Sequence, residues 1–148
     1  WLLPDWSSQR PPGPRDIARA AHGLGVPYTL VTGIVGPEDQ VENSLATPQA
    51  VLRTVRFERF EASFSGAGDT LSAALAALLA TGSELGEAVQ EALTYLDRSL
   101  AAGFRPGMGH VVPDRLFWAQ PGDDADADAT DTPDTAPDFD FPDPDTKH

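Results

Sequence analysis

The chain contains no cysteine, so neither a disulfide framework nor thiol chemistry contributes to its fold or function. Basic residues are also scarce, ten against 23 acidic ones, and they form no stripe that would suit a nucleic acid. No apolar run approaches the roughly 18 residues of a membrane-spanning helix. No basic segment leads into an apolar one as in a signal peptide. We therefore expect a cytoplasmic protein that binds neither nucleic acid nor a membrane.

The net charge of −13 is concentrated at the C-terminal end of the chain. Residues 121–148 contain ten aspartates and one lysine, whereas residues 1–120 carry a net charge of only −4. The segment is dominated by Asp, Ala, Thr and Pro and has too few large apolar residues to offset the entropy of ordering. We predict a folded domain at 1–120 and a disordered acidic tail at 121–148, which either binds a partner or only solubilises the chain.

Apolar periodicity and turn residues predict an α/β fold for residues 1–120. Strands are expected at 1–3 and 26–32, a hairpin at 41–47 and 50–57, and helices at 14–24, 69–80 and 83–102. Consecutive apolar residues in the strand at 26–32 favour a parallel sheet covered on both faces. Two or three parallel strands make a thin sheet, and the chain begins at Trp1. We therefore expect that the first half of a longer protein is missing.

The segment Gly66-Ala67-Gly68-Asp69 predicts a tight turn that opens directly into a helix. The N–H groups of Gly66, Ala67 and Gly68 and the positive end of the helix dipole would together form an anion site suited to a phosphate. Asp69 would repel a resting phosphate, but it could accept a proton from a hydroxyl group that attacks the phosphate. The simpler alternative is that the turn only caps the helix and that Asp69 is a favourable charge at its N-terminus.

This motif resembles the G-[AT]-G-D signature of the ribokinase-like small-molecule kinases. The resemblance implies a three-layer α/β/α sandwich of which only the C-terminal portion is present. It also implies that Gly66, Ala67 and Gly68 hold the transferring phosphoryl group of ATP and that Asp69 is the catalytic base. Thr32 and Gly33 would lie at the nucleotide side, Mg²⁺ would accompany ATP, and a small molecule would be the acceptor.

Two flanking segments resemble the vitamin-kinase branch of this superfamily. They are residues 70–74, which read T-L-S-A-A, and residues 107–110, which read G-M-G-H. The greatest similarity is to the hydroxymethylpyrimidine and phosphomethylpyrimidine kinases of thiamine synthesis, with pyridoxal kinase as the near alternative. Many thiamine-pathway kinases have Cys in place of Asp69. Relatives also tend to have the motif P-N-x-x-E, whose acid helps to hold magnesium. This chain has Pro4-Asp5-Trp6-Ser7-Ser8 at that place, with Ser8 where the acid is expected. Asp5 is then the candidate residue for the metal.

Two further readings stay open at the level of sequence. The chain could be a non-catalytic nucleotide-binding remnant, or a structural segment whose tail recruits a partner. Thr32 could simply end a strand, while Arg105 and His110 are more typical of an exposed loop than of a ligand site. The resemblance also favours a homodimer.

Overall fold

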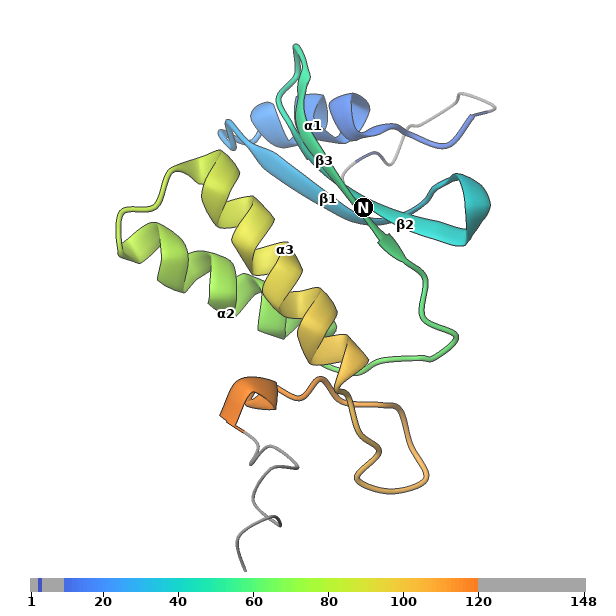
Figure 1. Ribbon diagram of the computed structural model, residues 1–148. Coiled ribbons are helices and arrows are strands. Elements are labelled where there is room, and N and C mark those ends of the chain that lie inside the picture. Colours follow the sequence, from blue (N-terminus) through green and yellow to red (C-terminus); the bar gives the residue numbers. More distant parts are fainter. Residues whose placement is uncertain (1–2, 4–9, 120–148) are drawn as a thin grey trace, which may run out of the picture. The chain divides into compact units, whose positions relative to one another are not determined.

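The computed structural model describes Leu3 and residues 10–119, and the fold is that of the unit that ends at Trp118. Figure 1 shows its elements. They are α1 (Pro14–His22), β1 (Thr29–Val35), β2 (Gln40–Ala46), β3 (Val51–Glu58), α2 (Ala67–Ala80) and α3 (Leu85–Ala101), with 3-10 turns at Pro37–Asp39 and Phe117–Ala119. Asp5, most of the strand expected at 1–3 and the tail at 121–148 lie outside the described residues.

The three named strands form one antiparallel sheet in the order β1-β2-β3. The expected hairpin is confirmed, and Thr47 N–H donates to the Ala50 carbonyl (2.8 Å) where the chain reverses. The parallel strand expected at 26–32 is wrong. The strand begins at Thr29 and pairs antiparallel with β2, because the 3-10 turn between them is too short for a parallel crossover. Val26 and Tyr28, expected to be covered, are 44% and 50% exposed.

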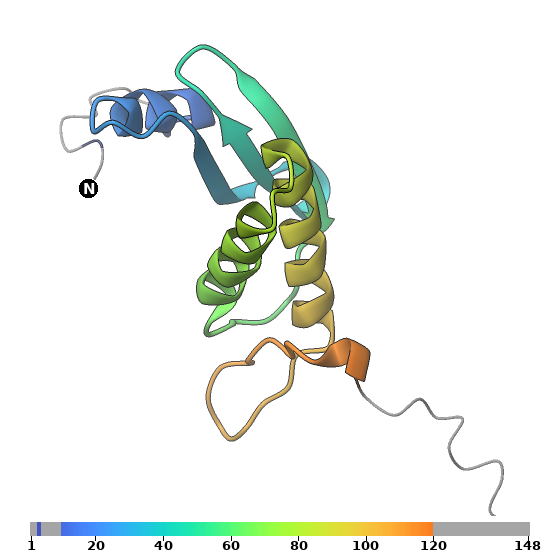
Figure 2. The ribbon, with the colours of Figure 1, turned by 90° about the vertical axis from the view of Figure 1, so that its left-hand side faces the viewer.

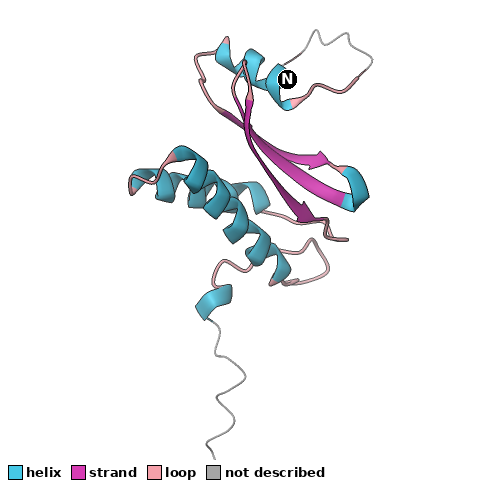
Figure 3. Ribbon diagram, turned by 45° about the horizontal axis from the view of Figure 1, so that its top comes forward, coloured by secondary structure: helices cyan, strands magenta, loops and turns pink. Residues whose placement is uncertain are grey.

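The helices cover the two faces of this sheet, as Figures 2 and 3 show. α1 packs on β1 and β2, while α3 packs on β3 and holds α2 beside it. Leu45 of β2 and Val55 of β3 enter a buried cluster with Leu71, Val89 and Leu93 of the helix pair. Because successive strand residues face opposite sides, Ala46 lies on the α1 side, and it is fully buried. The result is an α/β/α arrangement with the main core between the sheet and the α2–α3 pair.

The ends of α3 differ in detail from the sequence-based expectation. The helix expected at 83–102 spans 85–101, and Glu84 is its N-cap residue, whose carboxylate accepts a hydrogen bond from Gly86 N–H (2.8 Å). Beyond α3, Phe117 docks against Tyr95, with ring centroids 5.7 Å apart, whereas Trp118 is 68% exposed. No helix in the described part of the chain is long and apolar enough to cross a membrane.

Candidate nucleotide and phosphoryl site

The N-terminus of α2 lies at the predicted glycine turn and starts two residues earlier than expected, at Ala67. Gly66 precedes it in the left-handed conformation (φ 86°, ψ 8°), which side-chain-bearing residues rarely adopt. The first helical hydrogen bond runs from Thr70 N–H to the Gly66 carbonyl (3.0 Å). The N–H groups of residues 66–69 precede this bond and have no acceptor within the helix. They leave a positive helix end, because no side chain at the N-cap position accepts a hydrogen bond from these N–H groups.

Thr32 and Gly33 form an interruption in strand β1. The pairing with β2 shifts register between Val31 and Ile34, and Gly33 has a φ of 73°. The N–H group of Gly33 donates to the side-chain oxygen of Asn43 on β2 (3.2 Å), and Asn43 is only 6% exposed. The bulge therefore takes Thr32 and Gly33 out of the regular ladder of strand hydrogen bonds. The buried Asn43 side chain accepts the hydrogen bond of the Gly33 N–H group in place of a strand partner.

One cavity of about 210 Å³ brings these two segments together. Thr32 and Gly33 line it from the sheet, and Ala67 and Gly68 line it from the start of α2, although the two pairs are separated by more than 30 residues in the sequence. Its remaining wall is mainly aliphatic and aromatic: Val41, Phe57, Phe60, Leu71, Leu93, Leu96 and Leu100. A mainly apolar hollow with the start of a helix in its wall is a candidate for a ligand that has a flat apolar part and an anionic end, although Glu58 and Asp97 also line it.

Asp69 is exposed in the first turn of α2 and does not line this cavity. Its exposure leaves the carboxylate accessible to a second molecule that approaches the start of α2. The arrangement is compatible with a base that acts on an acceptor while a phosphate occupies the N–H groups.

Asp97 of α3 is a lining residue that the sequence analysis did not identify. Burial raises the pKa of its carboxyl group above the ordinary value of 3.8, and the nearby negative charge of Glu58 raises it further. The signal was present in the sequence, because Asp97 lies four residues after Leu93 and eight after Val89 on an otherwise apolar helix face. The sequence contains no comparable pattern that would place Asn43 at this cavity.

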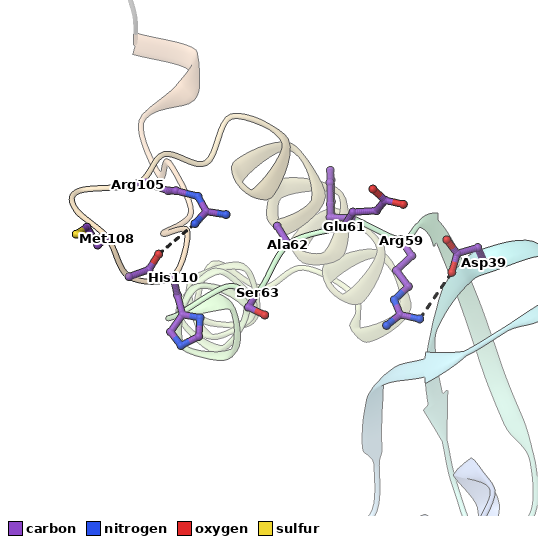
Figure 4. Close-up of a pocket in the computed structure, with 10 residues that line it drawn as sticks. Asp39, Arg59, Glu61, Ala62, Ser63, Arg105, Met108 and His110 are labelled. Carbon is purple, nitrogen blue, oxygen red and sulfur yellow. Dashed lines mark hydrogen bonds and ion pairs between the residues drawn. The ribbon is translucent and has the colours of Figure 1, made fainter.

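A second, wider cavity of about 840 Å³ lies between the loop at 59–63 and the loop at 105–110. Figure 4 shows Arg59, Ser63, Arg105 and His110 around it. Arg59 pairs with Asp39 (3.7 Å) and Arg105 Nη1 contacts the Gly109 carbonyl (3.5 Å). His110 is exposed. No helix N-terminus lines this cavity, so the smaller cavity is the better candidate for a phosphate site.

No cluster of three or more His, Cys, Asp or Glu side chains occurs in the part of the chain that the structure describes. Asp5, the candidate from the sequence, lies outside that part.

Solved structures with a similar fold include two pyridoxal kinases. The Bacillus subtilis enzyme in its ADP complex has a TM-score of 0.63 at 23% identity, over 72% of this chain and 42% of that one. The Staphylococcus aureus enzyme with AMP-PCP and pyridoxal also has a TM-score of 0.63, at 21% identity, over 72% and 40%. A proposed phosphomethylpyrimidine kinase from Bacteroides thetaiotaomicron has a TM-score of 0.50 at 20% identity, over 60% and 31%. The chain therefore shares the fold of part of these kinases.

Residues 6–114 match the family described as phosphomethylpyrimidine kinase, and the chain belongs to that family. A comparison with curated proteins found no match. The chain spans less than half the length of the pyridoxal kinases whose fold it shares.

Exchange of either glycine of the turn for alanine gives a matched pair of variants. Gly66→Ala is expected to lower the free energy of unfolding by about 1–2 kcal/mol, because alanine resists the left-handed conformation. Gly68→Ala should leave stability unchanged or slightly higher, since nothing lies within 4 Å of the added Cβ and alanine favours a helix. Urea unfolding of both variants measures the difference. Equal stability of the two would contradict the assigned turn.

The raised pKa of Asp97 predicts how stability depends on pH. The folded state holds the proton more tightly than the unfolded state, so this group makes stability fall as pH rises from 3.8 through the folded-state pKa. Asp97→Asn should therefore unfold at higher urea concentration than the wild type at neutral pH. This difference in stability between Asp97→Asn and the wild type should vanish below the pKa that Asp97 has in the unfolded state. A constant difference across this pH range would show that Asp97 is not the titrating group.

Proposed function

We propose that this chain carries the nucleotide-binding and phosphoryl-transfer part of an ATP-dependent kinase for hydroxymethylpyrimidine or its monophosphate. The observation that carries the proposal is the single cavity lined by Thr32 and Gly33 from the sheet and by Ala67 and Gly68 from the start of α2. Membership of the phosphomethylpyrimidine kinase family supports the reaction class and favours a pyrimidine acceptor.

In this proposal the nucleoside of ATP lies against the apolar wall, and its terminal phosphate points at the start of α2. The N–H groups of residues 66–68 stabilise the charge that develops on the transferring phosphoryl group. Asp69 takes the proton from the hydroxyl group of the substrate while the oxygen of that hydroxyl group forms a bond to the γ-phosphorus. The bond from that phosphorus to the β–γ bridging oxygen breaks, and ADP leaves. Mg²⁺ enters bound to the phosphates of ATP, as part of the substrate.

A second candidate is a pyridoxal kinase. The observation in its favour is that both pyridoxal kinases described above share the fold, one with ADP and one with AMP-PCP and pyridoxal. A nucleotide-binding protein without turnover remains the third reading. The cytoplasmic location, the homodimer, the domain boundary at 120 and the disorder of the acidic tail stay predictions.

The acceptor can be assigned by ATP consumption of the full-length gene product with Mg²⁺, offered hydroxymethylpyrimidine and pyridoxal side by side. We expect preferential turnover of the pyrimidine. Turnover of pyridoxal alone would keep the proposed roles of the site residues and would identify a pyridoxal kinase. ATP binding with turnover of neither compound would favour a nucleotide-binding protein without kinase activity.

Asp69→Asn tests the catalytic base. The exchange preserves the size of the side chain but removes the proton acceptor, so kcat should fall by about 10²–10⁴-fold while ATP affinity stays close to that of the wild type. Initial rates and calorimetric ATP titration measure the two quantities. A parallel loss of both would mean that Asp69 supports nucleotide binding or folding instead of proton transfer.

A further inference from the structure

A hydrogen-bonded relay connects Arg115, near the C-terminal end of the described fold, to the turn before α2. The Nε of Arg115 donates to the hydroxyl oxygen of Thr70 (3.0 Å), and that hydroxyl donates to the Gly66 carbonyl (2.8 Å). A threonine hydroxyl has one proton, so its donation to Gly66 leaves it as the acceptor for Arg115. Thr70 is only 2% exposed, which makes both partners necessary for its buried oxygen.

The same carbonyl of Gly66 accepts two hydrogen bonds from Thr70. One comes from its hydroxyl and the other from its N–H group (3.0 Å). These bonds fill both lone pairs of the carbonyl oxygen and fix the peptide plane between Gly66 and Ala67. The direction of the Ala67 N–H group, one of the four at the helix end, is thereby fixed as well.

The backbone around Arg115 is itself attached to α3. The hydroxyl of Tyr95 donates to the Arg115 carbonyl (2.8 Å), and Asp114 N–H donates to the Ser99 carbonyl (2.9 Å). Arg115 is therefore held against α2 by a rigid helix, although its own segment has no regular structure between Val112 and Phe117.

The charge of Arg115 is placed beside the turn. Its Nη2 lies 3.3 Å from the point that a Cβ on Gly66 would occupy. None of the ion pairs found among the described residues involves Arg115. The guanidinium group thus adds positive potential to the helix end that already attracts anions.

We propose that Arg115 is a positioning residue for the phosphoryl site, which acts through Thr70 to fix the Gly66 turn and adds positive charge beside it. This inference rests on the proposed function, because it assigns Arg115 to the site where that function places the terminal phosphates of ATP. Arg115 is distant in sequence from the glycine motif and is assigned only by its contacts.

The test compares the affinities of the full-length protein for ATP and for AMP, which lacks the terminal phosphates. Arg115→Ala and Thr70→Val should each lower the ATP-to-AMP affinity ratio by about tenfold, because a charge-assisted hydrogen bond at the phosphate site is lost. Thr70→Ser keeps the hydroxyl and should restore the ratio. The double variant should lose no more than either single variant, since both exchanges break one relay.

Arg53→Ala is the matched control. Arg53 is also exposed, and its guanidinium also donates one side-chain hydrogen bond, to Gln90 (3.3 Å), but it lies on β3 away from the turn. Its exchange should leave the ratio unchanged. A wild-type ratio near one would overturn the phosphate placement in the proposed function. A high wild-type ratio that Arg115→Ala and Thr70→Val both leave intact would overturn the role of Arg115 alone.

Discussion

The left-handed conformation of Gly66 is the constraint on which the candidate site depends. It turns the chain from the loop after β3 directly into α2 and leaves four backbone N–H groups without acceptors at the helix start. Thr70 locks the turn from inside the helix, and Arg115 locks Thr70 from the segment after α3. A backbone site of this kind is preorganised, because its donors are fixed before any anion arrives.

The proposed function has a second requirement, a wall for the rest of the nucleotide, and the antiparallel sheet would supply it. The bulge at Thr32 and Gly33 interrupts the pairing of the edge strand β1 with β2. The side chain of Asn43 accepts the hydrogen bond of the Gly33 N–H group there. The α2–α3 pair packs on the same face of the sheet through Leu45, Val55 and Leu93. The packing that forms the core thus also sets the spacing between the two halves of the cavity.

Much of this could be predicted from the sequence. The hairpin and the three helices follow from periodicity and turn residues. The glycine motif marks the start of α2 because residues with a side chain rarely adopt the left-handed conformation of Gly66. The direction of strand pairing could not be predicted, since an apolar run such as 26–32 is compatible with either a parallel or an antiparallel neighbour. The role of Arg115 depends on a contact between residues 45 positions apart, which no local pattern encodes. The pairing of Gly33 with Asn43 is likewise non-local.

The most direct test of the phosphoryl site is an NMR titration of the ¹⁵N-labelled protein with ATP, followed at the backbone amides. We expect the largest shifts at Ala67, Gly68 and Gly33, with the first two much reduced when AMP replaces ATP. The cavity around Arg59, Arg105 and His110 should respond little. Shifts confined to that wider cavity, with the start of α2 unaffected, would contradict the assignment of the phosphoryl site.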